Sequence, residues 1–360
     1  MLRNVVESAD ELQVRKLVRD SLNPRSALLT RFPNPIDSIL NLGILGLNTY
    51  DRIKRMSAVL DEITQGLSWQ LLDAWDGSVG KSKDRTKGTE SVYFENFSAI
   101  CQLEKQRPGI TRVLMEKYRI FNFARYPIDL LIDQYNSRDE ASALYGVIAS
   151  ARHDHNGAFL NIKDQIGGAY QQAKELGFGL KVLEVEDFDE MRRLIERSAE
   201  NHGPISFALV MAHGDQNFVT LGGDFLKGIG YYELSADLTK FKDTFIPSAS
   251  ICLISCSTGV ENGIGQRLSI ALPGTEIHSP DNEAMLREKG IIIEMVEGRL
   301  RIKVLFYRPE GNYNTVEDLI QVGLIPEEAD LITRTFAEHP EEIPTRVYRD
   351  GEQVNAYARK

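Results

Sequence analysis

The sequence predicts an α/β protein in which helices flank a mostly parallel sheet, preceded by a helical N-terminal extension. After residue 140, short apolar runs alternate with segments of helical period, and this alternation is typical of βαβ units. The runs are apolar at nearly every position, which indicates strands buried on both faces. Before residue 140, apolar residues recur at mixed three- and four-residue spacings, as in amphipathic helices.

The composition supports a folded globular protein. The chain has 360 residues, 42% of them hydrophobic, which is room for one large domain or two ordinary ones. Its net charge of −10 argues against a general nucleic-acid binder, which would carry a basic face. No segment approaches the roughly 20 apolar residues of a membrane helix, and no signal-like apolar run opens the chain. We therefore expect a cytoplasmic protein that binds neither nucleic acid nor membrane, with signal-independent export as the alternative.

The cysteines and histidines give no metal or disulfide signature. Cys101, Cys252 and Cys256 are odd in number and lack CxxC spacing, which favours a reducing compartment over a disulfide framework or a zinc cage. His153 and His155 stand one residue apart, but no further ligand cluster accompanies them. We expect no metal and no cofactor.

The patterns divide the chain into three regions. Residues 1–140 are expected to be helical and either to regulate the protein or to bind a regulatory protein partner. Residues 141–310 form the α/β domain, and residues 311–360 are expected to form a charged helical tail. Within the first region, residues 77–91 (GSVGKSKDRTKGTES) are polar and contain glycine, which predicts an exposed loop.

The elements of the α/β region can be predicted in order along the chain. The expected strands are 144–149, 180–185, 205–212, 250–255 and 275–278, followed by a hairpin of 291–296 and 300–307. The expected helices are 161–176, 188–200, a short one at 238–245, and 263–272. Asp187 precedes the second of these helices and is its predicted N-cap.

Two apolar strands end in reactive residues. The run ISFALVMA leads into His213-Gly214-Asp215, and SICLIS leads into Cys256-Ser257-Thr258-Gly259. In an open parallel sheet, ligands bind beyond the carboxyl ends of the strands. A thiol needs a nearby base to become a thiolate at neutral pH, and an imidazole supplies one. The sequence therefore predicts a catalytic pair of His213 and Cys256, whereas Cys252, inside its apolar run, is interpreted as a core residue.

These two blocks resemble the caspase-like (clan CD) superfamily of cysteine peptidases, which is marked by an apolar block ending in His-Gly and a second ending in Ala/Ser-Cys. His213 lies 43 residues before Cys256, close to the spacing of about 50 residues in caspases. The sequence ISCSTG (254–259) is nearest to CHAT-domain and clostripain-like members and departs from the QAC[RQG]G of true caspases. The resemblance covers residues 143–307.

The resemblance implies a caspase-like fold and hydrolysis of peptide bonds in a protein or peptide substrate. Cys256 would be the nucleophile that forms an acyl-enzyme, and His213 would accept and donate the proton. The backbone N–H groups of Gly214 and Cys256 are expected to bind the oxyanion. Members of this superfamily often activate by cutting an internal loop, so self-processing is expected within residues 76–91 or 222–244.

The specificity pocket is left open by the sequence. Arg152 and Asp154 follow the first strand of the α/β region, where the superfamily often places a pocket residue. Arg152 would favour an acidic substrate residue, whereas Asp154 would favour a basic one. Asp281, after the strand 275–278, is another possible pocket carboxylate. A solvated polar loop is the competing interpretation of all three.

Two other functions use the same features. A catalytically silent protein could keep the fold as an interaction module. A Cys-His acyltransferase or deamidase would use the same thiol chemistry on another acyl group.

Overall fold

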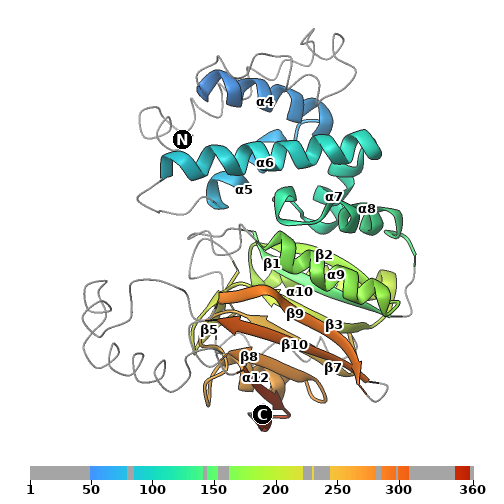
Figure 1. The fold of residues 1–360 in the computed structure, drawn as a ribbon, viewed down its shortest axis with the longest axis vertical. Helices are drawn as coiled ribbons and strands as arrows, with labels where there is room; N and C mark the ends of the chain where they lie inside the picture. Colours follow the sequence, from blue (N-terminus) through green and yellow to red (C-terminus); the bar gives the residue numbers. More distant parts are fainter. Residues whose placement is uncertain are drawn as a thin grey trace, which may run out of the picture.

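The computed structural model describes residues 49–78, 85–140, 144–152, 162–221, 229–230, 244–280, 285–296, 299–307 and 345–356. Figure 1 shows a layer of helices from the N-terminal part of the chain next to the β1–β2 side of a sheet. Asp154, Asp281, the histidine pair at 153 and 155, and most of the predicted short helix at 238–245 lie outside the described residues.

The helical layer consists of α4 (Thr49–Thr64), α5 (Ser68–Ser78), α6 (Arg85–Gln106), α7 (Ile110–Tyr118), the short 3-10 helix η2 (Phe123–Arg125) and α8 (Ile128–Asn136). These helices pack around the fully buried Trp75. Its indole Nε1 donates to the carbonyl of Phe121 at 2.8 Å, and its ring meets that of Tyr93 edge to face at 5.5 Å. The described part of residues 1–140 is thus largely helical.

The predicted loop at 77–91 is wrong at both ends, because residues 77 and 78 end α5 and residues 85–91 form the first turns of α6. The buried positions Val92, Tyr93 and Phe97 fix the middle of this helix against the layer. Extending a helix that is already anchored adds a hydrogen bond for each residue ordered, so polar residues continue it at little cost. The polar composition was therefore a poor guide to the local structure.

The central sheet has the strand order β12-β11-β8-β7-β3-β1-β2. Its parallel part contains β1 (Tyr145–Ala151), β2 (Gly179–Val185), β3 (Ile205–Met211), β7 (Phe245–Ile254) and β8 (Glu276–Pro280). Every residue of β1 and β3 is buried, as expected for parallel strands covered on both faces. The predicted mostly parallel sheet is confirmed.

The C-terminal part of the chain adds strands where a helical tail was expected. β11 (Thr345–Arg349) pairs antiparallel with β8, and β12 (Glu352–Ala356) pairs antiparallel with β11. The tail prediction is wrong for these residues. Asp350 and Gly351 both have positive φ, 52° and 85°, and this two-residue turn chemistry is typical of a tight hairpin. The Asp-Gly dipeptide was the signal that the charged composition concealed.

Helices cover both faces of the sheet, as predicted (Figure 1). α9 (Lys163–Glu175) connects β1 to β2, and α10 (Phe188–His202) returns from β2 to β3 on the other side of β1. Because crossovers are right-handed, this reversal puts the two helices on opposite faces. The predicted N-cap is confirmed, since the Asp187 side chain accepts a hydrogen bond from the Glu190 amide at 2.7 Å.

The remaining described elements lie around this core. α12 (Ile264–Ala271) packs on β8 and β11, and the predicted hairpin is formed by β9 (Met285–Val296) and β10 (Arg299–Tyr307). The short strands β4 (His213–Gly214), β5 (Phe218–Thr220) and β6 (Ile229–Gly230) make a separate small sheet. Among the described residues, no helix is long and apolar enough to cross a membrane.

The helical layer docks on the outer edge of β2. The Gln134 side chain of α8 donates to the Val182 carbonyl at 2.9 Å and accepts from the Val182 amide at 2.8 Å. The Gln134 side-chain amide thus pairs with the edge strand as another strand would, and it protects the edge from intermolecular pairing.

Candidate functional site

His213 and Cys256 lie at the carboxyl ends of adjacent strands. In the parallel pair β3–β7, Met211 is in register with Ile254, and the Ala212 amide donates to the Ile254 carbonyl at 3.2 Å. His213 and Cys256 each follow two residues after this pair. Neighbouring strands are about 4.8 Å apart, so both residues emerge at the same edge of the sheet. Their predicted positions are confirmed, and their catalytic role stays a prediction.

The turn that carries Cys256 is held in place by neighbouring strands. Ser257 adopts a left-handed conformation, with φ of 51°, which turns the chain immediately after the cysteine. The Gly259 amide donates to the Pro280 carbonyl of β8 at 2.6 Å, and the Tyr348 hydroxyl of β11 donates to the Gly259 carbonyl at 2.8 Å. A Cβ at Gly259 would lie only 2.3 Å from the Ser279 carbonyl oxygen, so only glycine fits there.

The segment that carries His213 has its own support. His213 and Gly214 form β4 and pair with Thr220 and Val219 of β5. Asp215, the next residue, closes the hairpin, because its Oδ1 accepts hydrogen bonds from the amides of Asn217 at 2.6 Å and Phe218 at 3.1 Å. The carboxylate beside the histidine therefore shapes a turn.

The histidine and cysteine segments interlock. A Cβ placed on Gly214 would lie 2.9 Å from the γ-methyl of Thr258 and 3.2 Å from the Cβ of Ser255. The first amides of α12 are shared between the two segments, since Ile264 donates to the Gln216 carbonyl at 2.8 Å and Gly265 donates to the Thr258 carbonyl at 2.9 Å. The helix start therefore holds the two turns in a fixed relation, which a nucleophile and its base require.

The three cysteines differ in environment, and the core position predicted for Cys252 is confirmed. Cys252 and Cys101 are buried, whereas Cys256 is partly exposed. Burial raises the pKa of Cys101 to about 12, and burial also raises the pKa of Cys252. These two sulfurs stay protonated at neutral pH and are inert core residues. Cys256 is the cysteine that a substrate can reach.

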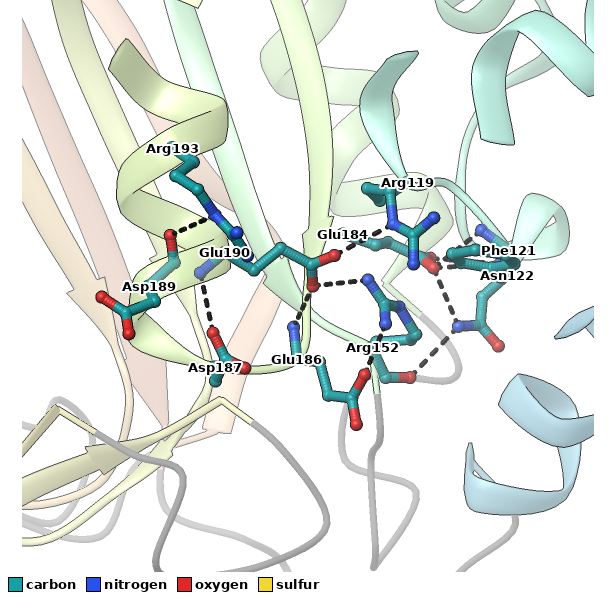
Figure 2. Close-up of polar contacts among 10 residues, drawn as sticks. All are labelled: Arg119, Phe121, Asn122, Arg152, Glu184, Glu186, Asp187, Asp189, Glu190 and Arg193. Carbon is teal, nitrogen blue, oxygen red and sulfur yellow. Dashed lines mark hydrogen bonds and ion pairs between the residues drawn. The ribbon is translucent and has the colours of Figure 1, made fainter. Parts of the chain in front are cut away.

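Arg152 is occupied by an ion-pair cluster. Its Nη1 lies 2.8 Å from Glu186 and its Nη2 lies 2.6 Å from Glu190, while its guanidinium carbon lies 4.8 Å from the centre of the Phe121 ring (Figure 2). The side chain is buried, with 6% exposed. Two carboxylates thus already balance the charge that was predicted to bind an acidic substrate residue. That role of Arg152 stays a prediction, and this cluster counts against it.

The helical layer contributes a set of contacts that the sequence did not predict. Arg125 and Asn122 donate to the carbonyls that end β1, and Glu184 of β2 accepts hydrogen bonds from the segment between α7 and α8. The signal available in the sequence was the pair of charged residues, Lys181 and Glu184, in the otherwise apolar strand GLKVLEV. A buried charge needs partners. These two residues therefore predict that a further layer covers the strand, but they do not predict which residues of that layer bind them.

Comparison with known protein families and curated proteins assigns no activity to this chain. A family model described as "Domain of unknown function (DUF8616)" matches residues 180–294. This range runs from β2 into β9 and includes both His213 and Cys256. It covers less than half of the chain and so does not assign the chain to a family. A search of curated proteins gives no match.

Proposed function

We propose that this protein is a caspase-like cysteine peptidase in which Cys256 is the nucleophile and His213 is the general base. The observation that carries the proposal is the register of β3 and β7, which places the two residues at the same edge on adjacent strands. The partly exposed state of Cys256 supports it, and so does the interlock of the two turns. The resemblance of the two sequence blocks supplies the reaction.

The reaction follows from these two groups. His213 takes the thiol proton, and the Cys256 sulfur attacks the carbonyl carbon of the scissile peptide bond to form a C–S bond. The carbonyl oxygen takes the displaced electron pair and is bound by the amides of Gly214 and Cys256. The imidazolium then gives its proton to the leaving amine as the C–N bond breaks. Water, deprotonated by His213, attacks the acyl-enzyme, releases a carboxylate and restores the thiol.

The strand order supports a substrate lying along this edge. In an open sheet, the crevice opens where the strand order reverses. Here the order β2-β1-β3 places that point between the carboxyl ends of β1 and β3. His213 lies at the end of β3, and Cys256 follows on the next strand, β7. A peptide crossing the ends of β1, β3 and β7 would therefore reach both groups.

Cysteine labelling tests the proposal. Iodoacetamide should modify Cys256 roughly tenfold or more faster than Cys101 and Cys252, because a cysteine paired with an imidazole is more often a thiolate. The fast labelling should disappear in His213→Ala. Equal slow labelling of all three cysteines would refute the catalytic pair and favour an interaction module with a peptidase-like fold.

A peptide library distinguishes hydrolysis from other acyl chemistry. We expect cleavage of peptide bonds that is lost in Cys256→Ala. Labelling of Cys256 without any cleavage would instead favour an acyltransferase or deamidase. Analysis of the cleaved bonds would also show whether an acidic or a basic residue precedes the cut.

Self-processing belongs to the same proposal. Residues 85–91 are helical, and nicking favours exposed loop tips, so this part of the first predicted segment is a poor substrate. We therefore place self-cleavage between residues 79 and 84 or within 222–244. Mass spectrometry after prolonged incubation should find fragments ending there in the wild type and none in Cys256→Ala.

A further inference from the structure

The segment that joins α7 to α8, residues 119–126, is called the brace here, because it holds the carboxyl end of β1. Arg125 is buried, and its Nη1 donates to the Ala151 carbonyl at 2.8 Å. The Asn122 side chain donates to the Arg152 carbonyl at 3.1 Å (Figure 2). The helical layer therefore fixes the last carbonyl of β1 and the carbonyl that follows it.

The brace is itself anchored to β2 through Glu184. This fully buried carboxylate accepts hydrogen bonds from the Phe121 amide at 2.8 Å, the Asn122 amide at 3.2 Å and the Tyr126 hydroxyl at 2.9 Å. It also accepts from the Asn122 side chain at 3.1 Å. A buried carboxylate supplied with several donors holds its surroundings rigidly, because each lost donor exposes an unpaired charge.

Glu190 of α10 links the brace to Arg152 from the other side. One carboxylate oxygen accepts from Nε of Arg119 at 2.9 Å, and the other accepts from Nη2 of Arg152 at 2.6 Å and from the Glu186 amide at 2.8 Å. The Phe121 ring contacts both guanidinium groups, at 5.1 Å from Arg119 and 4.8 Å from Arg152. Figure 2 shows the Glu190 carboxylate joined to both arginines.

We infer that the brace, acting through Glu190 and Arg152, positions one wall of the substrate site. Ser150 of β1 is in register with Met211 of β3, and Arg152 and His213 each follow two residues later. The end that the brace holds is therefore the β1 side of the crevice between β1 and β3. The inference rests on the proposed peptidase function. It makes part of the N-terminal layer a component of the site rather than a separate regulatory extension.

This arrangement affects the binding of an extended substrate and leaves the thiol chemistry alone. β1 does not carry the nucleophile or the base, and the turns of His213 and Cys256 are fixed by β8, β11 and α12 instead. Loosening Arg152 should weaken a ligand that lies across β1 and β3. It should leave a small reagent at Cys256 unaffected.

The test compares two irreversible probes on the full-length chain. Iodoacetamide reports the thiol alone, and a peptidyl acyloxymethyl ketone, selected as the best labelling reagent for the wild type, reports binding (KI) and chemistry (kinact) separately. The variants are Glu190→Gln, which removes the central charge without changing the shape, and Arg119→Gln, which alters the more exposed arginine. Arg119→Lys should recover part of the loss. Arg192→Gln is the matched control, because Arg192 lies on the same helix but pairs with Glu196, at 3.2 Å.

Glu190→Gln should raise KI for the peptidyl probe roughly three- to tenfold, the cost of a partly buried charge-assisted hydrogen bond. Its kinact and its iodoacetamide rate should stay within about twofold of the wild type, as should every constant of Arg192→Gln. An unchanged KI in Glu190→Gln would overturn the inference, and so would an equal rise in the control. A parallel loss of iodoacetamide reactivity would overturn it too, since that marks general disruption. Slow labelling of Cys256 in the wild type would instead overturn the proposed function and, with it, the inference.

Discussion

Replacing Gly214 with alanine tests whether the histidine and cysteine turns really interlock. The added Cβ would lie 2.9 Å from the Thr258 γ-methyl, 3.1 Å from the Phe218 carbonyl oxygen and 3.2 Å from the Ser255 Cβ. All three distances are shorter than an ordinary van der Waals contact of a Cβ, which begins at 3.4 Å. Two of the three neighbours belong to the turn around Cys256, so the strain falls on the proposed site.

The expected cost follows from overpacking. Forcing one extra methyl into a packed interior costs about 1–3 kcal/mol, and the shortest contact involves a methyl group that a second substitution can remove. Thr258→Ser deletes that γ-methyl while keeping the hydroxyl, which lies 3.2 Å from the Ser255 hydroxyl. Thr258→Ser alone should cost about 1 kcal/mol for the lost buried methyl. In the double variant, we expect a coupling of about 1–2 kcal/mol that offsets part of the two single losses.

Urea unfolding of the four proteins, with iodoacetamide labelling of Cys256 in each, measures both effects. Gly214→Ala should lose stability and label more slowly, and adding Thr258→Ser should recover both. Gly168→Ala, inside α9, is the control, because the neighbouring atom nearest to its added Cβ is the side-chain nitrogen of Gln172, at 4.0 Å. It should stabilise the protein by about 0.5–1 kcal/mol through helix propensity. Full stability of Gly214→Ala, or additive losses in the double variant, would refute the interlock.

Three further predictions concern the helical layer. Burial lowers the pKa of Lys181 from 10.5 to about 8. Between these pH values the unfolded chain binds more protons than the folded chain, so the free energy of unfolding of the wild type rises with pH. Compared with Lys181→Met by urea unfolding, the wild type should gain about 2 kcal/mol from pH 7.5 to pH 10; a constant difference would contradict this. Gln134→Leu should cost about 2 kcal/mol or more in the same assay, because the Val182 N–H and C=O lose their partners, and an unchanged midpoint would argue against edge docking. A chain that begins at residue 141 should fail to unfold cooperatively on heating, since Glu184 would lose every hydrogen-bond donor that the brace supplies.

The α/β core and the strand ends of the site were predictable because their signals are local. A parallel strand buried on both faces is an unbroken apolar run, so β3 and β7 could be recognised from the sequence. The order of residues along the chain then placed His213 and Cys256 at their carboxyl ends. The pairing of those two strands was the one long-range assumption, and the register of Met211 with Ile254 bears it out. β11 and β12 failed the same procedure because five-residue strands with charged residues leave too short a pattern to recognise.

The brace could not be predicted, since its contacts join residues far apart in sequence through single side chains. Glu184 lies 63 residues from Phe121, whose amide donates a hydrogen bond to it, and Arg125 lies 26 residues from Ala151, to whose carbonyl it donates. Such contacts impose no period on the sequence. They do leave a deficit, because a strand with two buried charged residues, Lys181 and Glu184, cannot be stable in an apolar core alone. The change of pattern at residue 140 therefore marks a change of secondary structure. It does not divide the chain into two units that fold independently, because the partners of the buried charges in β2 come from residues before 140.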